Sequence, residues 1–274
     1  MKSLFLRTLR QSIFLLFALF ILSSTAVATA ASQTNAGASA IQSQSIIQSA
    51  VSSVDWSGYA VTGATFNKVE SQVTVPTVTC ATAKSESLFW VGLDGYQSTS
   101  NTVEQIGVGA TCTSVNSAPH YFAWWQMFAK GSNESFNQIA NFTVEPGYVV
   151  AETVTYNPTQ KNYVLQLSHG SQSFSTTRLC AGGYVCGRQS AEWVAERYTT
   201  EYVNGKAVYT PLAKWSGNAV FNKDWVVKST SSTLMRIDQL NNAEIYMYDG
   251  GPMATPGSLE TDGTEFGVSW VAAE

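Results

Sequence analysis

The chain has 274 residues, of which 45% are hydrophobic and only 12% charged, and its formal net charge is −4. Residues 1–30 hold three basic residues and no acidic one, so the remainder sets 12 Lys and Arg against 19 Asp and Glu, a net charge of −7. This balance argues against nucleic acid as a partner. A surface rich in Ser, Thr, Asn, Gln and Gly depends little on ionised carboxylates, which suggests the hypothesis of adaptation to acid.

Residues 1–30 have the pattern of a secretory signal peptide. Three basic residues precede an apolar run over 13–22, and small residues with two A-x-A sites follow at 26–30. The apolar run is too short to span a bilayer comfortably. We therefore expect a secreted, extracellular protein with no membrane attachment once the leader is cleaved.

The next segment, 31–52, has neither charged nor aromatic residues. This composition is typical of a flexible spacer, and we expect a spacer or a short pro-segment here. From residue 53 to 274 the sequence changes to aromatics, Val and Thr, punctuated by Gly, Asn and Pro. We expect this part to form a single domain.

The pattern over 53–274 predicts β-strands. In 68–76, alternation places Val69, Ser71, Val73 and Val75 on one face. Further strands are expected over 87–93, 121–128, 148–156, 162–168, 172–178, 243–248 and 265–271, with a hairpin turn at 168–170. No stretch keeps a helical period for more than two turns. The expected fold class is all-β, a single large sandwich or barrel.

Four cysteines in an exported chain predict disulfides. Of the three possible pairings we favour Cys80–Cys112 and Cys180–Cys186, because each closes a loop on its own side of the chain. No CxxC motif is present, and only His120 and His169 are available as histidine ligands, so we expect no metal site and no cofactor.

The segment 191–197, AEWVAER, carries two closely spaced carboxylates. On a strand, Glu192, Val194 and Glu196 point the same way. An unpaired buried carboxylate costs several kcal/mol, so we expect both to line water or a cleft. The spacing alone leaves acid/base chemistry, carbohydrate binding and a solvated face open.

Glu104 and Gln105 are adjacent, so on a strand only one of them can face a given cleft. Composition alone favours Glu104 as the chemical residue. Aromatic clusters at 56–59, 89–90 and 121–125 supply core on one face and a possible groove floor on the other. GxSxG and HExxH motifs are absent, and the Asp-Gly-Thr at 262–264 has the wrong order for a pepsin-like site.

Taken in order, several motifs resemble the glutamic peptidases, also called eqolisins. They are Trp-Ser-Gly-Tyr at 56–59, a TVP strand end at 74–76, WVGLDG at 90–95 with a Gln ten residues on, YFAWWQ at 121–126, an EPG turn at 145–147, and AEWVAER at 191–197. The resemblance implies a concanavalin A-like sandwich of two large antiparallel sheets, with the active site on a concave face. It also implies an endopeptidase that works in acid without a metal.

The family's catalytic Gln follows the W-x-G-x-D-G motif and matches Gln105. Its catalytic Glu is the second in E-[FW]-[IV]-x-E and matches Glu196, so the resemblance reverses the compositional preference for Glu104. Glu196 would take a proton from the attacking water and return it to the leaving amine, while Gln105 would stabilise the oxyanion.

The resemblance also implies a set of residues around this pair, which we group as substrate-binding or supporting: Trp56, Trp90, Asp94 and Glu192. Two positions depart from the family, because Gln126 and Gly109 stand where acidic residues are usual. Fewer carboxylates would alter the pH optimum or the substrate preference.

The expected function is a secreted, monomeric, pepstatin-insensitive acid endopeptidase acting on proteins or peptides. Two alternatives remain on a similar sandwich. A glycoside hydrolase would pair Glu196 with Glu192 or Asp94, and a non-catalytic carbohydrate-binding module would use the same aromatics. The role of Gln105 distinguishes the peptidase from these two alternatives, because only the peptidase requires this residue for activity.

Overall fold

The computed structural model describes residues 46, 48–131, 136–203 and 206–274. The expected leader and nearly all of 31–47 lie outside these residues. All elements belong to one compact unit that spans 44–274. Within the described part, no helix has the length and apolarity needed to cross a bilayer.

Strands make up most of this unit. The first half contains β1 (Gln48–Ser53), β2 (Trp56–Thr62), β3 (Phe66–Thr74), β4 (Thr77–Thr79), β5 (Ser85–Leu93), β6 (Thr102–Cys112), β7 (His120–Ala129), β8 (Asn137–Gln138), β9 (Val149–Asn157), β10 (Asn162–His169) and β11 (Gln172–Arg178). The second half contains β12 (Ala191–Glu196), β13 (Thr199–Val203), β14 (Lys206–Tyr209), β15 (Lys214–Ser216), β16 (Asn218–Lys228), β17 (Leu234–Arg236), β18 (Asn241–Tyr248), β19 (Pro252–Pro256) and β20 (Glu265–Trp270). Two single 3-10 turns, 181–183 and 237–239, complete the described elements.

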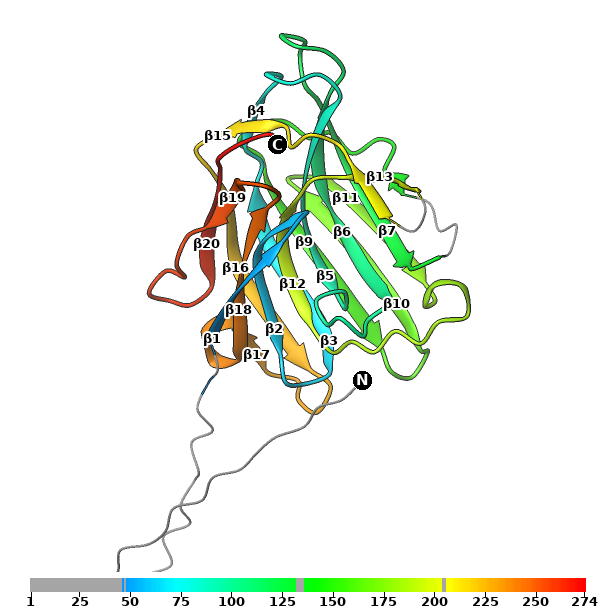
Figure 1. The fold of residues 1–274 in the computed structure, drawn as a ribbon. Coiled ribbons are helices and arrows are strands. Elements are labelled where there is room, and N and C mark those ends of the chain that lie inside the picture. Colours follow the sequence, from blue (N-terminus) through cyan, green and yellow to red (C-terminus); the bar gives the residue numbers. More distant parts are fainter. Residues whose placement is uncertain (1–45, 47, 132–135, 204–205) are drawn as a thin grey trace, which may run out of the picture. The chain divides into compact units, whose positions relative to one another are not determined.

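One hydrogen-bonded path connects most strands in the order β11-β10-β9-β3-β16-β20-β19-β18-β2-β12-β5-β6-β7-β8. The path doubles back at β19 and β18, so that β5 and β6 pack over β3, β9 and β10 (Figure 1). The result is a β-sandwich of curled antiparallel sheets, as expected. A parallel strand, β1, and a short strand, β17, pair with β18 and β16 outside this path.

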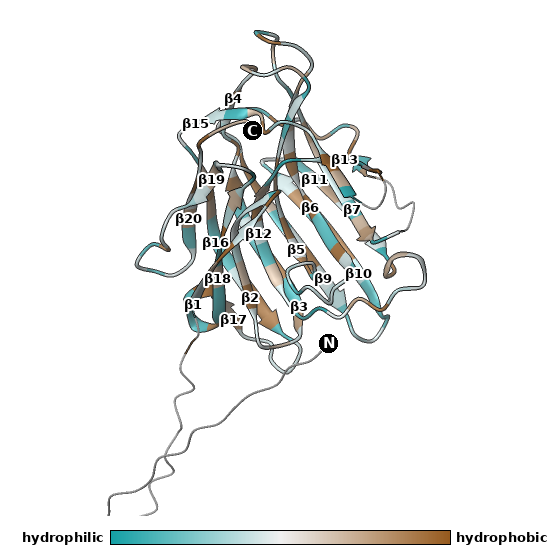
Figure 2. Ribbon diagram, viewed as in Figure 1, coloured by the Kyte–Doolittle hydropathy of each residue, from teal (hydrophilic) through white to brown (hydrophobic). Residues whose placement is uncertain are grey.

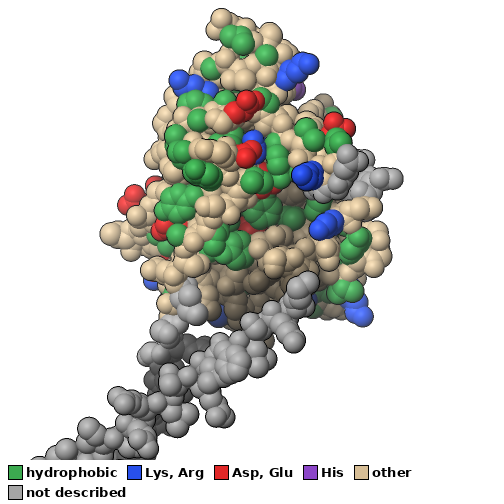
Figure 3. Space-filling model, in the orientation of Figure 1, with side chains coloured by type: hydrophobic (Ala, Val, Ile, Leu, Met, Phe, Trp, Pro, Cys, Tyr) green, Lys and Arg blue, Asp and Glu red, His purple; other side chains and the backbone are tan. Residues whose placement is uncertain are grey.

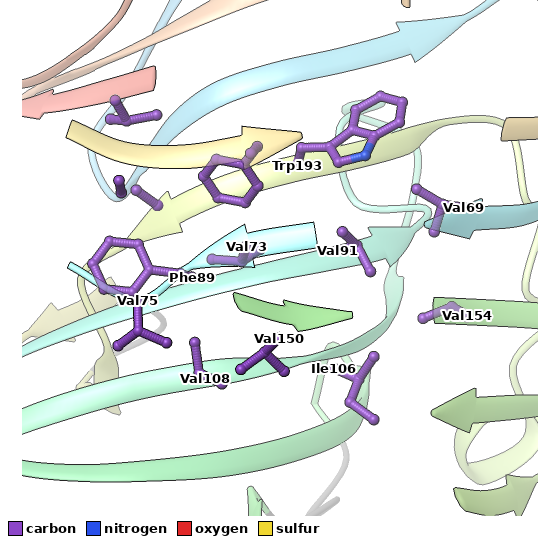
Figure 4. Packing of buried hydrophobic residues seen from close by; sticks show 14 of the residues in the cluster. Val69, Val73, Val75, Phe89, Val91, Ile106, Val108, Val150, Val154 and Trp193 are labelled. Atoms are coloured by element: carbon purple, nitrogen blue, oxygen red, sulfur yellow. The ribbon is translucent and has the colours of Figure 1, made fainter. Parts of the chain in front are cut away.

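The period of two along each strand builds the core. Hydrophobic and polar residues alternate along several strands (Figure 2), and the hydrophobic set faces the other sheet. Val69 and Val73 of β3 meet Phe89 and Val91 of β5 in this core (Figure 4). The face predicted for 68–76 is therefore confirmed, since Val69, Ser71, Val73 and Val75 are all buried.

The other sequence predictions for the fold also hold. Each expected strand is present within two residues of its predicted bounds, and β10 and β11 form the predicted hairpin, which turns at residues 170–171. The disulfides are Cys80–Cys112 and Cys180–Cys186, as favoured. One difference concerns the expected spacer, because its residues 48–52 form most of β1 alongside β18.

Candidate active site

The outer face of the β12-β5-β6-β7 sheet carries the candidate site. On each of these strands, alternate residues point into the core, such as Phe89, Ile106 and Trp193. The remaining residues point outward and form a second hydrophobic cluster of Leu88, Trp90, Val103, Phe122, Trp124 and Val194. This outer cluster forms the base of the site, and the polar residues of the site lie next to it.

A groove of about 430 Å³ lies on this floor. Both predicted catalytic residues, Gln105 and Glu196, line it. Its other walls are Asp55, Trp56, Leu88, Val103, Trp124, Gln126, Phe128, Phe136, Tyr198, Thr199, Thr200 and Glu201. The space-filling view shows this hollow with hydrophobic side chains at its base (Figure 3). A trough that combines aromatic and aliphatic walls with about as many polar groups suits an extended peptide, which offers apolar side chains and a polar backbone.

Glu196 is the last residue of β12, and two tryptophans hold its side chain. The indole Nε1 of Trp90 donates to Oε2 of Glu196 at 2.6 Å. Trp56 stands directly opposite Glu196 on β2 and packs edge-on against Trp90, with ring centroids 5.0 Å apart. Burial raises the pKa of Glu196 well above its ordinary value, the nearby charge of Asp55 raises it further, and the indole of Trp90 opposes the shift.

Gln105 is nearly buried on β6, and its amide has a defined direction. Nε2 donates to Oε1 of Gln126, its direct neighbour on β7, at 3.2 Å. Oε1 of Gln105 has no hydrogen-bond partner among the described residues. The side chain therefore has one further N–H donor beside the groove, while its Oε1 is buried.

Glu104 points the opposite way, into the core. It is completely buried beside Asp94, and burial followed by the charge of Asp94 raises its pKa well above the ordinary value. Composition alone therefore selected the wrong member of the pair for the groove. The alternation rule was right that only one of them can face it.

Of the four residues predicted to bind substrate or support the pair, Trp56 lines the groove, whereas Trp90, Asp94 and Glu192 are buried and do not line it. The carboxylate of Asp94 accepts the backbone N–H groups of Arg188 and Gln189 at 2.6 and 2.9 Å. The pKa of Glu192 is raised mainly by burial, and hydrogen bonds from the Ser190 side chain and the Tyr96 backbone oppose this shift. The idea that two carboxylates on one strand face must both reach water fails here, because protonation makes burial of Glu192 tolerable.

The two departures from the family have different structural settings. Gln126 lies in the groove and bonds Gln105. At Gly109 there is no room for a side chain, since a Cβ would come within 2.7 Å of Leu88 and 2.9 Å of Phe122. The outer hydrophobic cluster thus occupies the space that an acidic residue at this position would need.

Asp55, Phe136 and Tyr198 are among the groove residues that sequence reasoning missed. Asp55 directly precedes the Trp-Ser-Gly-Tyr motif, which was the one signal that could have pointed to it. Phe136 stacks on Trp124 with centroids 4.8 Å apart and meets Tyr198 edge-on at 5.1 Å. These rings come from separate segments, and no local pattern connects them.

In the described part of the chain, a single group of side chains combines three potential metal ligands. It consists of Glu104, Cys180 and Cys186, whose ligand atoms lie within 4.8 Å of one another. Both sulfurs are joined in a disulfide and so offer no thiolate. This donor set is therefore a packing contact between the disulfide and a buried carboxyl group.

Comparison with known proteins identifies the family. The model of the peptidase A4 family matches residues 54–269, almost the whole described unit. The chain belongs to the peptidase A4 family. This peptidase A4 assignment favours a peptidase over the glycoside hydrolase and the carbohydrate-binding module. No curated protein matches the chain in sequence.

Solved structures support the A4 fold. Scytalido-glutamic peptidase with a transition state analog inhibitor is 18% identical, with 80% of this chain and 98% of that chain covered and a TM-score of 0.66. SCP-B, an eqolisin solved with the tripeptide Ala-Ile-His, gives the same identity and coverage and a TM-score of 0.63. At this identity the likeness shows the fold. Together with the family match, it makes this A4 member a glutamic-type endopeptidase.

Proposed function

We propose that the protein is an acid-active endopeptidase in which Glu196 activates water and Gln105 stabilises the oxyanion. The observation that carries this proposal is that both side chains line one groove, although their positions are 91 residues apart. The groove also offers apolar walls for the side chains of an extended peptide.

Glu196 is the general base. As a carboxylate held by the Trp90 indole, it takes a proton from a water molecule that attacks the scissile carbonyl carbon. The carbonyl oxygen becomes the oxyanion of a tetrahedral intermediate. Glu196, now protonated, gives the proton to the departing amine, and the carbon–nitrogen bond breaks. The cycle ends with Glu196 ionised again.

Gln105 supplies the electrostatic stabilisation. One of its two Nε2 hydrogens is used by Gln126, and the second is available for the oxyanion. Loss of one oxyanion donor costs about 10² to 10³ in rate in comparable sites.

The test is cleavage of denatured casein or haemoglobin from pH 2 to 7 with pepstatin present. We expect acid-limited proteolysis by the wild type and loss of most activity in Glu196→Gln and in Gln105→Ala, with folding intact by circular dichroism. Glu260→Gln, the same change at an exposed position outside the groove, is the control and should stay active. Near-normal turnover by either groove variant would refute the mechanism.

We also propose that the enzyme is secreted as a monomer. The two disulfides fit an oxidising compartment, and the leader pattern at 1–30 fits export. N-terminal sequencing of the protein from culture medium and its mass in solution test this. An uncleaved, cell-retained chain or a stable dimer would contradict it.

A further inference from the structure

Asp55 brings a second carboxyl group to the groove beside Glu196. It lies in the two-residue link between β1 and β2, and it is partly buried. The side chain of Ser53 donates to Oδ1 of Asp55 at 2.7 Å, and the backbone N–H of Trp56 donates to the same serine oxygen at 3.2 Å. These bonds fix the direction of the Asp55 carboxyl group.

The backbone ties Asp55 to β12. The N–H of Arg197, the residue after Glu196, donates to the Asp55 carbonyl oxygen at 3.1 Å. In the pairing of β2 with β12, the next residue, Trp56, lies opposite Glu196. Asp55 and Glu196 are therefore held at the same end of neighbouring strands, and both line the groove.

We propose that Asp55 is a positioning residue for catalysis, which forms a carboxyl pair with Glu196 in the groove and sets the pH at which Glu196 becomes ionised. This inference rests on the proposed function. Two carboxyl groups held together resist carrying two negative charges, so their ionisations separate. The hydrogen bond from Ser53 favours the ionised form of Asp55, and the negative charge of Asp55 opposes ionisation of Glu196.

The other charges near Glu196 have smaller effects on it than Asp55 has. Burial and then Asp55 raise the pKa of Glu196, and Glu86 adds a smaller effect of the same sign. Burial raises the pKa of Glu86 itself to about 7, so Glu86 is neutral in acid. Tyr198 also has a raised pKa, mainly through burial, and carries no charge there. The exposed Glu201 is the other carboxyl group on the groove wall.

One cation lies near Asp55. Arg197 lowers the pKa of Asp55, while burial, the larger effect, raises it. The Arg197 guanidinium itself bonds Asp249 and lies over the ring of Tyr209 at 4.4 Å. Arg197 is thus already paired outside the carboxyl pair. The negative charge of Asp55 therefore acts on Glu196 without being fully cancelled.

The experiment measures kcat/KM against pH for an internally quenched peptide with wild type, Asp55→Asn and Ser53→Ala. Without the charge at 55, Glu196 ionises at lower pH, so the acid limb should move down by roughly one pH unit. Ser53→Ala should move it less, in the same direction. Asp262→Asn, an exposed control, should leave it in place. A ¹³C titration of the Glu196 carboxyl group gives the same shift without relying on activity.

The outcomes are separable. Activity with an unmoved acid limb in Asp55→Asn, or loss of activity at every pH in a folded variant, overturns the role of Asp55 and leaves the general base untouched. If Asp55→Asn does not fold, an unmoved limb in Ser53→Ala overturns it. Activity retained by Glu196→Gln is a different result, which removes the proposed function itself.

Discussion

Gln105 and Gln126 face each other across β6 and β7, and the amide of Gln105 donates to the side-chain oxygen of Gln126 at 3.2 Å. The acceptor is an amide, so it has no ionisation of its own. It can therefore accept an N–H of Gln105 at every pH of the acid range.

Replacing Gln126 by Met keeps the side-chain length and removes the acceptor. We expect kcat to fall roughly threefold to tenfold with KM nearly unchanged, because a hydrogen bond of this kind contributes about 0.5–1.5 kcal/mol. The Gln126→Glu variant should have a higher kcat than Gln126→Met at low pH. Its kcat should fall as the pH rises and the new carboxyl group ionises. Equal kcat for the wild type and Gln126→Met at all pH values would show that Gln105 needs no such support.

Trp90→Phe tests the hydrogen bond to Glu196. The indole N–H favours the charged form of Glu196, so its removal should raise that pKa and move the acid limb of kcat/KM upward. The expected loss at low pH is on the order of tenfold or more, since hydrogen bonds to charged groups contribute about 1.5–3 kcal/mol. This shift is opposite in sign to that of Asp55→Asn. A downward or absent shift, seen in the pH profile, would contradict the assignment.

The aromatic wall of Trp124, Phe136 and Tyr198 predicts a preference for bulky apolar side chains near the scissile bond. We expect Phe136→Ala to raise KM about tenfold for peptides with Phe or Leu there, because the lost apolar burial is about 1–2 kcal/mol. Matched peptides with Ala at the same position should be little affected. A uniform change across both peptide sets would assign Phe136 to folding instead of specificity.

Buried carboxyl groups predict that the fold is more stable in acid than at neutral pH. Glu104 and Glu192 are both completely buried, and this burial raises both pKa values well above the ordinary value. The folded state thus holds protons that the unfolded state releases. Their contribution is complete below the ordinary pKa of Glu and is lost as pH rises through the raised values.

Thermal unfolding of the wild type and Glu104→Gln from pH 3 to 8 checks this expectation. The wild-type Tm should fall toward neutral pH, and the fall should be smaller in Glu104→Gln, which has no proton to lose at that position. Glu260→Gln serves as the exposed control and should follow the wild type. Parallel curves for Glu104→Gln and the wild type would assign the neutral-pH loss to other groups.

The sequence by itself determined the all-β class, most strand positions, the pairing of the cysteines and the faces of β12. The strand faces follow from local physics, because a period of two sets which side chains share a face. The cysteine pairing was favoured among three because each pair closes a loop on its own side of the chain. Composition favoured Glu104 as the chemical residue, and the motif resemblance reversed this choice in favour of Gln105.

Only the tertiary structure decided what covers each face. Glu192 and Glu196 share a side of one strand, yet Glu192 is enclosed and Glu196 reaches the groove. Likewise, Asp55 joins Glu196 only because β2 pairs with β12, some 135 residues further along the chain. Periodicity describes the direction of a side chain relative to its own strand. The neighbours that bury, charge or orient that side chain come from distant segments brought together by sheet pairing.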